Sequence, residues 1–160
     1  SGKYLEPLID PFKTNFCIGV GGYPEKHFEA NDMNTDMKRL KQKVDNGADY
    51  IVTQMFYDNK AYFKFVELCK KEGIDVPIIP GIKILSTESH LKMLPKHFHI
   101  NLPSELISAV EGKSKTEIRN AGIDWAVKQV DELIEAKVPC VHFYIMASAK
   151  SATQVVSEFI

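Results

Sequence analysis

Residues 49–56 read DYIVTQMF, and this stretch decides the fold class. Apolar and β-branched residues follow one another almost without interruption, which is typical of a strand buried on both faces in a parallel sheet. Gln54 is the exception near the end of the run. A buried amide needs hydrogen-bond partners, so we interpret Gln54 as a residue that contacts a polar ligand, with partners inside the protein as the alternative.

Three further apolar segments have the same character, and helical segments separate them. The predicted strands cover residues 16–22, 49–56, 76–84 and 139–147. The predicted helices cover residues 33–47, 59–73, 88–97, 103–112, 114–137 and 151–160. The long helix opens with Ser114 and Glu117 in a capping-box pattern. This alternation predicts a single α/β domain, residues 1–160, with a parallel sheet.

Two architectures are compatible with this order of elements. One is an open, doubly wound sheet, and the other is part of a (β/α)₈ TIM barrel. The Gly-rich turn GxGxxG of dinucleotide-binding sheets is absent from GVGGYP, residues 19–24. The barrel is therefore favoured, but a complete barrel needs about 250 residues. The chain supplies only four strand–helix units, which predicts a half-barrel.

The amino-acid composition limits the kinds of molecule that the chain is expected to bind. The chain has 160 residues, with 20 basic and 21 acidic ones, so its charge gives no support to nucleic acid or an anionic membrane as a partner. We find no segment long and apolar enough to span a bilayer. Cys17, Cys69 and Cys140 lie in apolar segments without CxxC spacing. We expect reduced core thiols of a cytoplasmic protein, and no metal site.

The carboxyl ends of the predicted strands are where ligands bind in both architectures. After the first strand come Gly21 and Gly22, which either form a tight turn or let a flat ligand approach the backbone. Tyr23 and His27 follow, either as ligand contacts or as ordinary loop residues. Together with Gln54 these residues predict a polar pocket with aromatic side chains.

Two groups of basic residues can be interpreted either as solvent-exposed side chains or as ligand contacts. Arg39 and Lys43 are four residues apart on one helix face, where solvent exposure is the norm and contact with a phosphate is the alternative. His97 and His99 have an alternating spacing, but no acidic or cysteine partner stands beside them. We interpret these histidines as solvated loop residues.

Four blocks of the sequence resemble the methylenetetrahydrofolate reductase family. They are GVGGYPEKHFEA (19–30), DMKRLKQKVDNGADYIVTQMFYDN (36–59), VPIIPGIKI (76–84) and VHFY (141–144). The resemblance implies a (β/α)₈ barrel that holds FAD and reduces 5,10-methylenetetrahydrofolate to 5-methyltetrahydrofolate with NADH or NADPH. It also implies a ping-pong order, in which N5 of the flavin is reduced first and then passes hydride to the folate. The resemblance thus implies an oxidoreductase of one-carbon metabolism and methionine biosynthesis.

The resemblance implies contacts to the cofactor from the loop after the first strand and from the following helix. By position in the motifs, the FAD-contacting residues are Tyr23, His27, Ala30, Asp36, Arg39 and Lys43. A cation directed at a pyrophosphate is physically sensible, which favours the phosphate interpretation of Arg39 and Lys43.

For the folate, the resemblance implies substrate contacts from Gln54, His90, Leu94 and Ser148. Three of these positions depart from the family pattern. His90 stands in place of a glutamine, Leu94 in place of an aromatic residue, and Ser148 in place of an arginine. Lys150 is a partial substitute for that arginine.

The family's catalytic acid has no counterpart here, so the resemblance assigns no catalytic residue to this chain. The four strands match strands five to eight of the barrel. We therefore expect the isolated chain to be inactive, because hydride transfer to the folate also needs a proton. A half-barrel leaves two sheet edges exposed, and we expect a second copy or a missing N-terminal half to cover them. The alternative function is a non-catalytic flavin- or folate-binding module that needs a partner chain.

Overall fold

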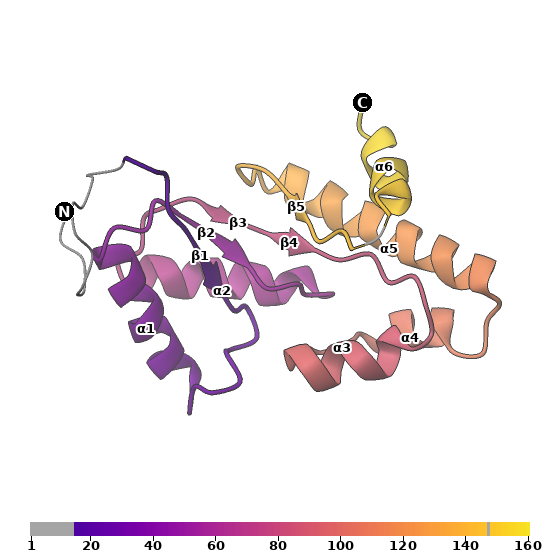
Figure 1. The fold of residues 1–160 in the computed structure, drawn as a ribbon, viewed down its shortest axis with the longest axis horizontal. Coiled ribbons are helices and arrows are strands. Elements are labelled where there is room, and N and C mark those ends of the chain that lie inside the picture. The colour runs from indigo at the N-terminus through magenta and orange to yellow at the C-terminus, as the bar shows by residue number, and fades with distance from the viewer. Residues whose placement is uncertain (1–14, 147) are drawn as a thin grey trace, which may run out of the picture.

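The computed structural model describes residues 15–146 and 148–160 and contains an α/β arrangement with short parallel strands (Figure 1). The strands are β1 (Gly19–Gly22), β2 (Tyr50–Thr53), β3 (Ile78–Ile79), β4 (Gly81–Ile82) and β5 (His142–Phe143). The helices are α1 (Met33–Asp45), α2 (Asn59–Lys71), α3 (His90–Phe98), α4 (Ser104–Val110), α5 (Lys115–Glu135) and α6 (Lys150–Ser157).

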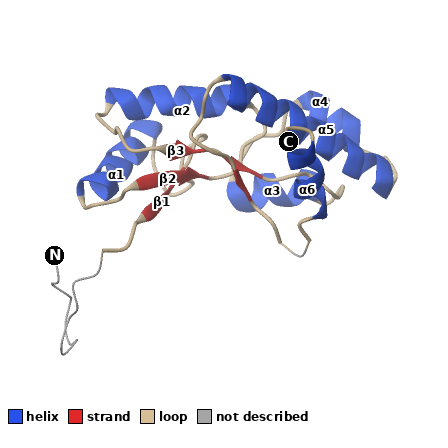
Figure 2. Cartoon of the chain, turned by 90° about the horizontal axis from the view of Figure 1, so that it is seen from above, coloured by secondary structure: helices blue, strands red, loops and turns tan. Residues whose placement is uncertain are grey.

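The strands pair in the order in which they occur in the chain. β2 lies between β1 and β3, β4 pairs with β5, and all the pairs are parallel. The helices also contact one another in the order of the chain: α1 contacts α2, α2 contacts α5, and α5 contacts α6. In Figure 2, α2 and α5 lie along one side of the strands. A doubly wound sheet reverses its strand order part-way, and the described strands show no such reversal.

Local sequence explains where the helices begin and end. The Asp32 side chain accepts a hydrogen bond from Thr35 N and caps α1, which ends just before Gly47 in a left-handed conformation at φ 104°. The predicted capping box at the start of α5 is confirmed, because the Ser114 hydroxyl and the Glu117 carboxylate each accept the other's backbone N–H.

The segment predicted as one strand over residues 76–84 is broken at Pro80. Proline has no N–H to donate to the ladder, so β3 ends before it and β4 begins after it. The Pro80 carbonyl instead accepts a hydrogen bond from His142 N at 2.9 Å, and the Gly81 N–H donates to Thr53 Oγ1 at 2.9 Å. As a result, β3 pairs with β2, whereas β4 pairs with β5.

The prediction of three core cysteines is wrong for two of them. Cys69 is buried in α2, but Cys17 and Cys140 are exposed. Cys17 precedes β1 and Cys140 precedes β5, and each of these strands has one paired neighbour among the described residues. Apolar sequence around a cysteine therefore does not ensure burial when the strand lies at the edge of a sheet.

Two apolar clusters hold the elements together. The larger one joins α1, α2 and α5 to the strands through residues such as Leu40, Ile51 and Phe65. The smaller one packs α3 and α4 against the first half of α5, around Leu94 and Leu106. Within residues 15–146 and 148–160, no helix has both the length and the apolar content that crossing a bilayer requires.

Candidate functional site

The loop between β1 and α1, residues 23–32, is a tightly bonded turn. The Lys26 N–H donates to the Tyr23 carbonyl at 3.1 Å, and Lys26 has a positive φ of 79°. The rings of Tyr23 and His27 meet edge to face, with centroids 4.4 Å apart and an interplanar angle of 76°. Both side chains are partly exposed, so their rings are accessible to a flat ligand.

Asp36 and Ala30 form the frame of this loop. Asp36 is 7% exposed, and its Oδ2 accepts a hydrogen bond from the His27 N–H at 2.8 Å. Ala30 is buried, and its carbonyl accepts a hydrogen bond from Lys26 Nζ at 2.5 Å. The carboxylate of Asp36 thus holds the backbone of His27 in place.

Arg39 and Lys43 extend the frame along α1 as exposed cations. Asp36, Arg39 and Lys43 are three and four residues apart, so they share a helix face. Lys43 Nζ donates to the Gly21 carbonyl at 3.2 Å, which places its charge beside the end of β1. In the described part of the chain, neither cation lies within salt-bridge distance of a carboxylate.

Gln54 follows β2 and lies beside this loop. Its backbone N–H donates to the Gly22 carbonyl at 2.7 Å, and its Oε1 accepts from Met55 N at 3.0 Å. Among the described residues, no acceptor is bonded to its Nε2 group. Gln54 and Tyr23 line the same shallow depression, with a volume of about 10 Å³. Gln54 is partly exposed, so its Nε2 donor is available for a further hydrogen bond.

Glu25 fastens the β1–α1 loop to the segment that follows α3. Its Oε2 accepts hydrogen bonds from the backbone N–H of Asn101 at 2.5 Å and from Asn101 Nδ2 at 3.1 Å. The rings of Phe28 and His99 stack across the same junction, with centroids 5.0 Å apart. Burial raises the pKa of Glu25, although the Asn101 hydrogen bonds oppose that shift.

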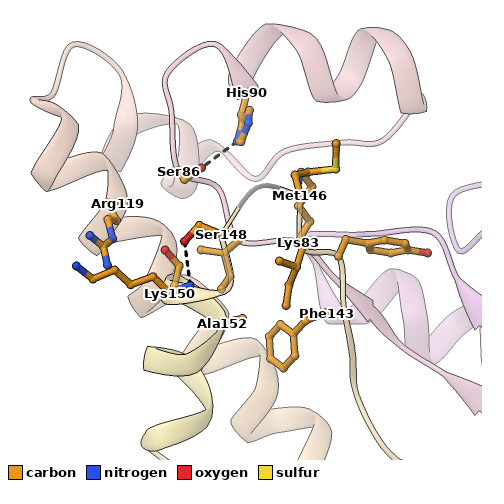
Figure 3. Close-up of a pocket in the computed structure, with 13 residues that line it drawn as sticks. Lys83, Ser86, His90, Arg119, Phe143, Met146, Ser148, Lys150 and Ala152 are labelled. Atoms are coloured by element: carbon orange, nitrogen blue, oxygen red, sulfur yellow. Dashed lines mark hydrogen bonds between the residues drawn. The ribbon is translucent and has the colours of Figure 1, made fainter.

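A second surface lies at the ends of β4 and β5 (Figure 3). This β4–β5 cavity has a volume of about 390 Å³. Its polar lining includes Lys83, Ser86, His90, Arg119, Ser148 and Lys150. The described residues that line it include neither aspartate nor glutamate. The cavity is therefore positively charged, and anions are the ligands it favours.

His90 is held in the cavity wall as a hydrogen-bond acceptor. Its Nδ1 accepts from the backbone N–H of Ser86 at 3.3 Å (Figure 3). Burial, and then the nearby Lys83, lower the pKa of His90. Burial also lowers the pKa of Lys83 itself. With Nδ1 accepting, the neutral imidazole carries its proton on Nε2 and can donate it to a ligand.

Tyr144 connects the cavity with the first surface. It lines the cavity, and its hydroxyl donates to the carbonyl of Thr53, the residue before Gln54, at 2.9 Å. Burial raises the pKa of Tyr144, and the neighbouring Tyr23 adds to the rise. The β1–α1 loop, Gln54 and the cavity thus lie next to one another at the carboxyl ends of the strands, and together they form the candidate site.

The structure divides the residues predicted to bind ligands into three groups. The β1–α1 loop and α1 bring together Tyr23, His27, Ala30, Asp36, Arg39 and Lys43, with Gln54 beside them. His90 and Ser148 line the β4–β5 cavity together with Lys150. Leu94 is 1% exposed within the smaller apolar cluster and is outside the cavity lining.

Sequence reasoning missed Arg119 as a member of this site. It lies on α5, on a helix that follows two connecting helices rather than at the end of a strand. Contact between α5 and α6 brings it to the cavity, and no local motif marks it. Lys83, by contrast, follows the third predicted strand, at one of the strand ends where ligands are expected to bind.

Comparison with known proteins identifies the family. A family model described as methylenetetrahydrofolate reductase matches residues 3–159. The chain belongs to the methylenetetrahydrofolate reductase family. The resemblance seen in the sequence blocks is thereby confirmed.

Individual relatives agree with the family model. The chain is 34% identical over 157 residues to the 5,10-methylenetetrahydrofolate reductase of Escherichia coli, covering 94% of the chain and 53% of that protein. It is 33% identical over 162 residues to methylenetetrahydrofolate reductase 1 of Schizosaccharomyces pombe, covering 98% of the chain and 27% of that protein. The chain therefore spans about half the length of the bacterial relative and about a quarter of the yeast one.

A solved structure shares the fold. It is an uncharacterized protein from Clostridium thermocellum, described as binding two copies of 5-methyl-5,6,7,8-tetrahydrofolic acid. The TM-score is 0.62 at 18% sequence identity, and the match covers 88% of this chain and 51% of the other. At this level of identity, the similarity is evidence for the fold alone.

Proposed function

We propose that this chain forms strands five to eight of the (β/α)₈ barrel of a FAD-dependent methylenetetrahydrofolate reductase. The observation that carries the proposal is the candidate site formed by the β1–α1 loop, Gln54 and the β4–β5 cavity. Two findings support the half-barrel: the parallel strands follow the chain order, and the chain covers 53% of its bacterial relative. In such a barrel, β1 and β5 would continue into the remaining strands.

The residues of the β1–α1 loop are compatible with FAD. Tyr23 and His27 offer accessible ring edges, and Arg39 and Lys43 offer two cations without a carboxylate partner in the described part of the chain. We assign the flavin ring to the aromatic pair and the pyrophosphate to the cations. Asp36 and Ala30 hold the loop in shape instead. Bound FAD would supply the two-electron chemistry between NADH or NADPH and the folate.

Gln54 is the residue we assign to the folate. Its free Nε2 donor and its Oε1 acceptor lie beside Tyr23, so a pterin edge could bond to the amide while its ring lies near the flavin position. His90 and Ser148 then contact the part of the substrate that extends into the cavity. The 5-methyltetrahydrofolate of the C. thermocellum neighbour supports a folate ligand for this fold. Leu94 is buried in the smaller apolar cluster, so we assign it a packing role instead of a substrate contact.

The reaction also needs a proton, which opens the five-membered ring of the methylenetetrahydrofolate. We assign no residue of this chain to that task and place the donor in the half of the barrel that the chain does not form. Residues 1–160 alone should therefore lack reductase activity. The second candidate, a flavin- or folate-binding module without turnover, makes the same prediction for the isolated chain.

Three measurements on the same purified protein test the proposal: its intact mass, its visible absorption spectrum and its turnover of methylenetetrahydrofolate. We expect flavin absorption bands and NAD(P)H-dependent turnover from the intact protein that contains this chain. Flavin bands without turnover in the intact protein would favour the binding module. A colourless intact protein that binds no added FAD would overturn the cofactor assignment.

A further inference from the structure

We propose that Glu25 is a positioning residue for the flavin and acts through Asn101: their hydrogen bonds hold the β1–α1 loop against the chain that follows α3. The inference rests on the proposed function, because it concerns how the loop assigned to FAD keeps its place. It adds to that site a residue that acts on the cofactor only through the position of the loop. Without the Glu25 carboxylate, Tyr23 and His27 keep their chemistry but lose their fixed positions.

The first argument is that two contacts fasten the loop to the same place, one on either side of His27. Two residues before His27, Glu25 Oε2 accepts hydrogen bonds from the backbone N–H and from Nδ2 of Asn101, at 2.5 and 3.1 Å. One residue after it, the ring of Phe28 stacks on His99 with an interplanar angle of 14°. His99 and Asn101 both follow α3, so the backbone on both sides of His27 is tied to one short segment.

The second argument is a continuous row of four rings. The His27 ring meets Tyr23 edge to face and lies 4.8 Å from the Phe28 ring, between centroids, and Phe28 in turn stacks on His99. The two rings assigned to the flavin therefore belong to a row that ends at the segment after α3. Phe28 is 57% exposed, so its stacking is a surface contact. The charged hydrogen bonds of Glu25 are the stronger of the two fastenings.

The third argument is that the Glu25 carboxylate is compensated by Asn101. Glu25 is partly buried, and burial raises the pKa of its carboxyl group, with a further rise from the charge of Asp58. The two Asn101 hydrogen bonds lower that pKa and so favour the charged form. Among the described residues Glu25 forms no salt bridge, and Nζ of the neighbouring Lys26 donates to backbone carbonyls of the loop instead. The ionised carboxylate is therefore favoured when the loop lies against Asn101.

The segment that receives the loop is firmly packed. Leu94 on α3 and Ile100, the residue before Asn101, are 1% and 5% exposed in the smaller apolar cluster. This packing does not depend on Glu25. Loss of the Glu25 hydrogen bonds should therefore release the loop and leave α3 where it is.

The test measures the dissociation constant of FAD for the intact protein freed of cofactor, by titration of flavin fluorescence. The variants are Glu25→Ala, Asn101→Ala, their combination, and Glu25→Gln, whose amide oxygen can still accept the Asn101 N–H. Glu88→Ala is the matched control. Glu88 Oε1 accepts the Gly112 N–H at 3.0 Å, so this variant also removes a bond between a carboxylate and the backbone, but just before α3 begins.

We expect Glu25→Ala to raise the dissociation constant of FAD by about tenfold, as the loss of charged hydrogen bonds allows. Asn101→Ala removes one of the two bonds, so it should raise the constant less and add nothing in the Glu25→Ala background. Glu25→Gln should restore part of the affinity, and Glu88→Ala should keep the wild-type value. In the protein without cofactor, hydrogen exchange at the Asn101 amide should be faster in Glu25→Ala than in Glu88→Ala.

Three results would overturn the inference while the proposed function stands. The first is wild-type FAD affinity in Glu25→Ala or, if that variant does not fold, in Asn101→Ala. The second is an effect of Asn101→Ala that is undiminished in the Glu25→Ala background. The third is an equal loss of affinity in Glu25→Ala and Glu88→Ala, which would reflect general destabilisation. An intact wild-type protein that binds no FAD would overturn the proposed cofactor together with this inference.

Discussion

The β1–α1 loop and the β4–β5 cavity lie on the same face but are built in opposite ways. At the loop, the Asp36 carboxylate of α1 and the Ala30 carbonyl accept hydrogen bonds from His27 and Lys26 of the loop. In the cavity, Lys83, Arg119 and Lys150 have no carboxylate partner among the described residues. The loop is therefore held in its conformation by hydrogen bonds within the protein. The cavity carries positive charge that no carboxylate of the described residues neutralises.

This difference separates two kinds of mutational effect. Substitutions in the frame of the loop should act through folding and through the order of the loop. Substitutions of the cations in the cavity should act through ligand binding, with little cost to the fold, because no intramolecular ion pair is lost. The predictions below test this separation, from the largest expected effect to the smallest.

Gly122→Ala should cause the largest loss of stability, because it disturbs the contact between α5 and the segment after β4. A Cβ atom at Gly122 would lie 1.7 Å from the backbone oxygen of Leu85, so α5 could no longer pack against the segment after β4. Helix propensity alone predicts a gain of about 1 kcal/mol for this change. Overpacking predicts a loss of about 3 kcal/mol or more.

Urea unfolding of the intact protein decides the sign of the Gly122→Ala effect. Asn120→Ala is the control, because Asn120 is an exposed residue two positions earlier in the same helix. A stabilised Gly122→Ala variant would show that α5 and the cavity wall do not pack as closely as described.

Asp36→Ala should lower stability by about 1–3 kcal/mol, because it leaves the N–H of His27 without an acceptor. The variant should also lower the ratio of flavin to protein absorbance, since Tyr23 and His27 would lose their fixed positions. Asp36→Asn is the matched control, because an amide oxygen can still accept that hydrogen bond. If Asp36→Asn loses as much flavin as Asp36→Ala, the carboxylate acts on the cofactor by its charge and not on the loop.

Features that depend on local sequence could be predicted. The alternation of strands and helices, the capping box at Ser114 and the turn at Gly47 each follow from a few adjacent residues. Residues 76–84 divide into β3 and β4 at Pro80. This division could not be predicted, because it depends on which strands lie on either side of the segment. Cys17 and Cys140 lie at sheet edges, and the sequence does not indicate which strands are edges.

The candidate site could be predicted at residues that directly follow strands, but not at residues that only packing between helices brings to it. Tyr23 and Gln54 follow β1 and β2 directly, so their meeting at one depression could be expected. Arg119 reaches the cavity only because α5 packs on α6, which brings it beside Gln154, 35 residues away. Leu94 lies one turn after His90 on α3, but its side chain packs in the smaller apolar cluster and does not line the cavity.

Gln54→Ala should raise the KM for methylenetetrahydrofolate by about tenfold, the effect of losing one or two hydrogen bonds to a bound ligand. The NAD(P)H half-reaction should change less, because we assign Gln54 to the folate. Gln54→Glu sharpens the test: a carboxylate keeps the acceptor for Met55 N but loses the Nε2 donor. Equal slowing of both half-reactions would count against the assignment of Gln54 to folate.

Lys83→Met should cause the smallest effect, a rise in the pKa of His90. Burial is the main cause that lowers this pKa, and the charge of Lys83 is the second. Removing the charge should move the pKa of His90 part of the way back toward its ordinary value of 6.5. NMR titration of the imidazole measures the change, with the resonance assigned by its absence in His90→Gln.

The sign of the stability change follows from the same shift. A histidine whose pKa is lower in the folded state stabilises the protein above pH 6.5 and loses that contribution as the pH falls toward the folded value. Lys83→Met should therefore reduce the acid sensitivity of the fold. Lys92→Met, an exposed change on the same helix as His90, is the control. If the pKa of His90 changes equally in both variants, the charge of Lys83 has no specific effect on His90. That result would weaken the distinction between a cavity with unpaired cations and a loop held by its own hydrogen bonds.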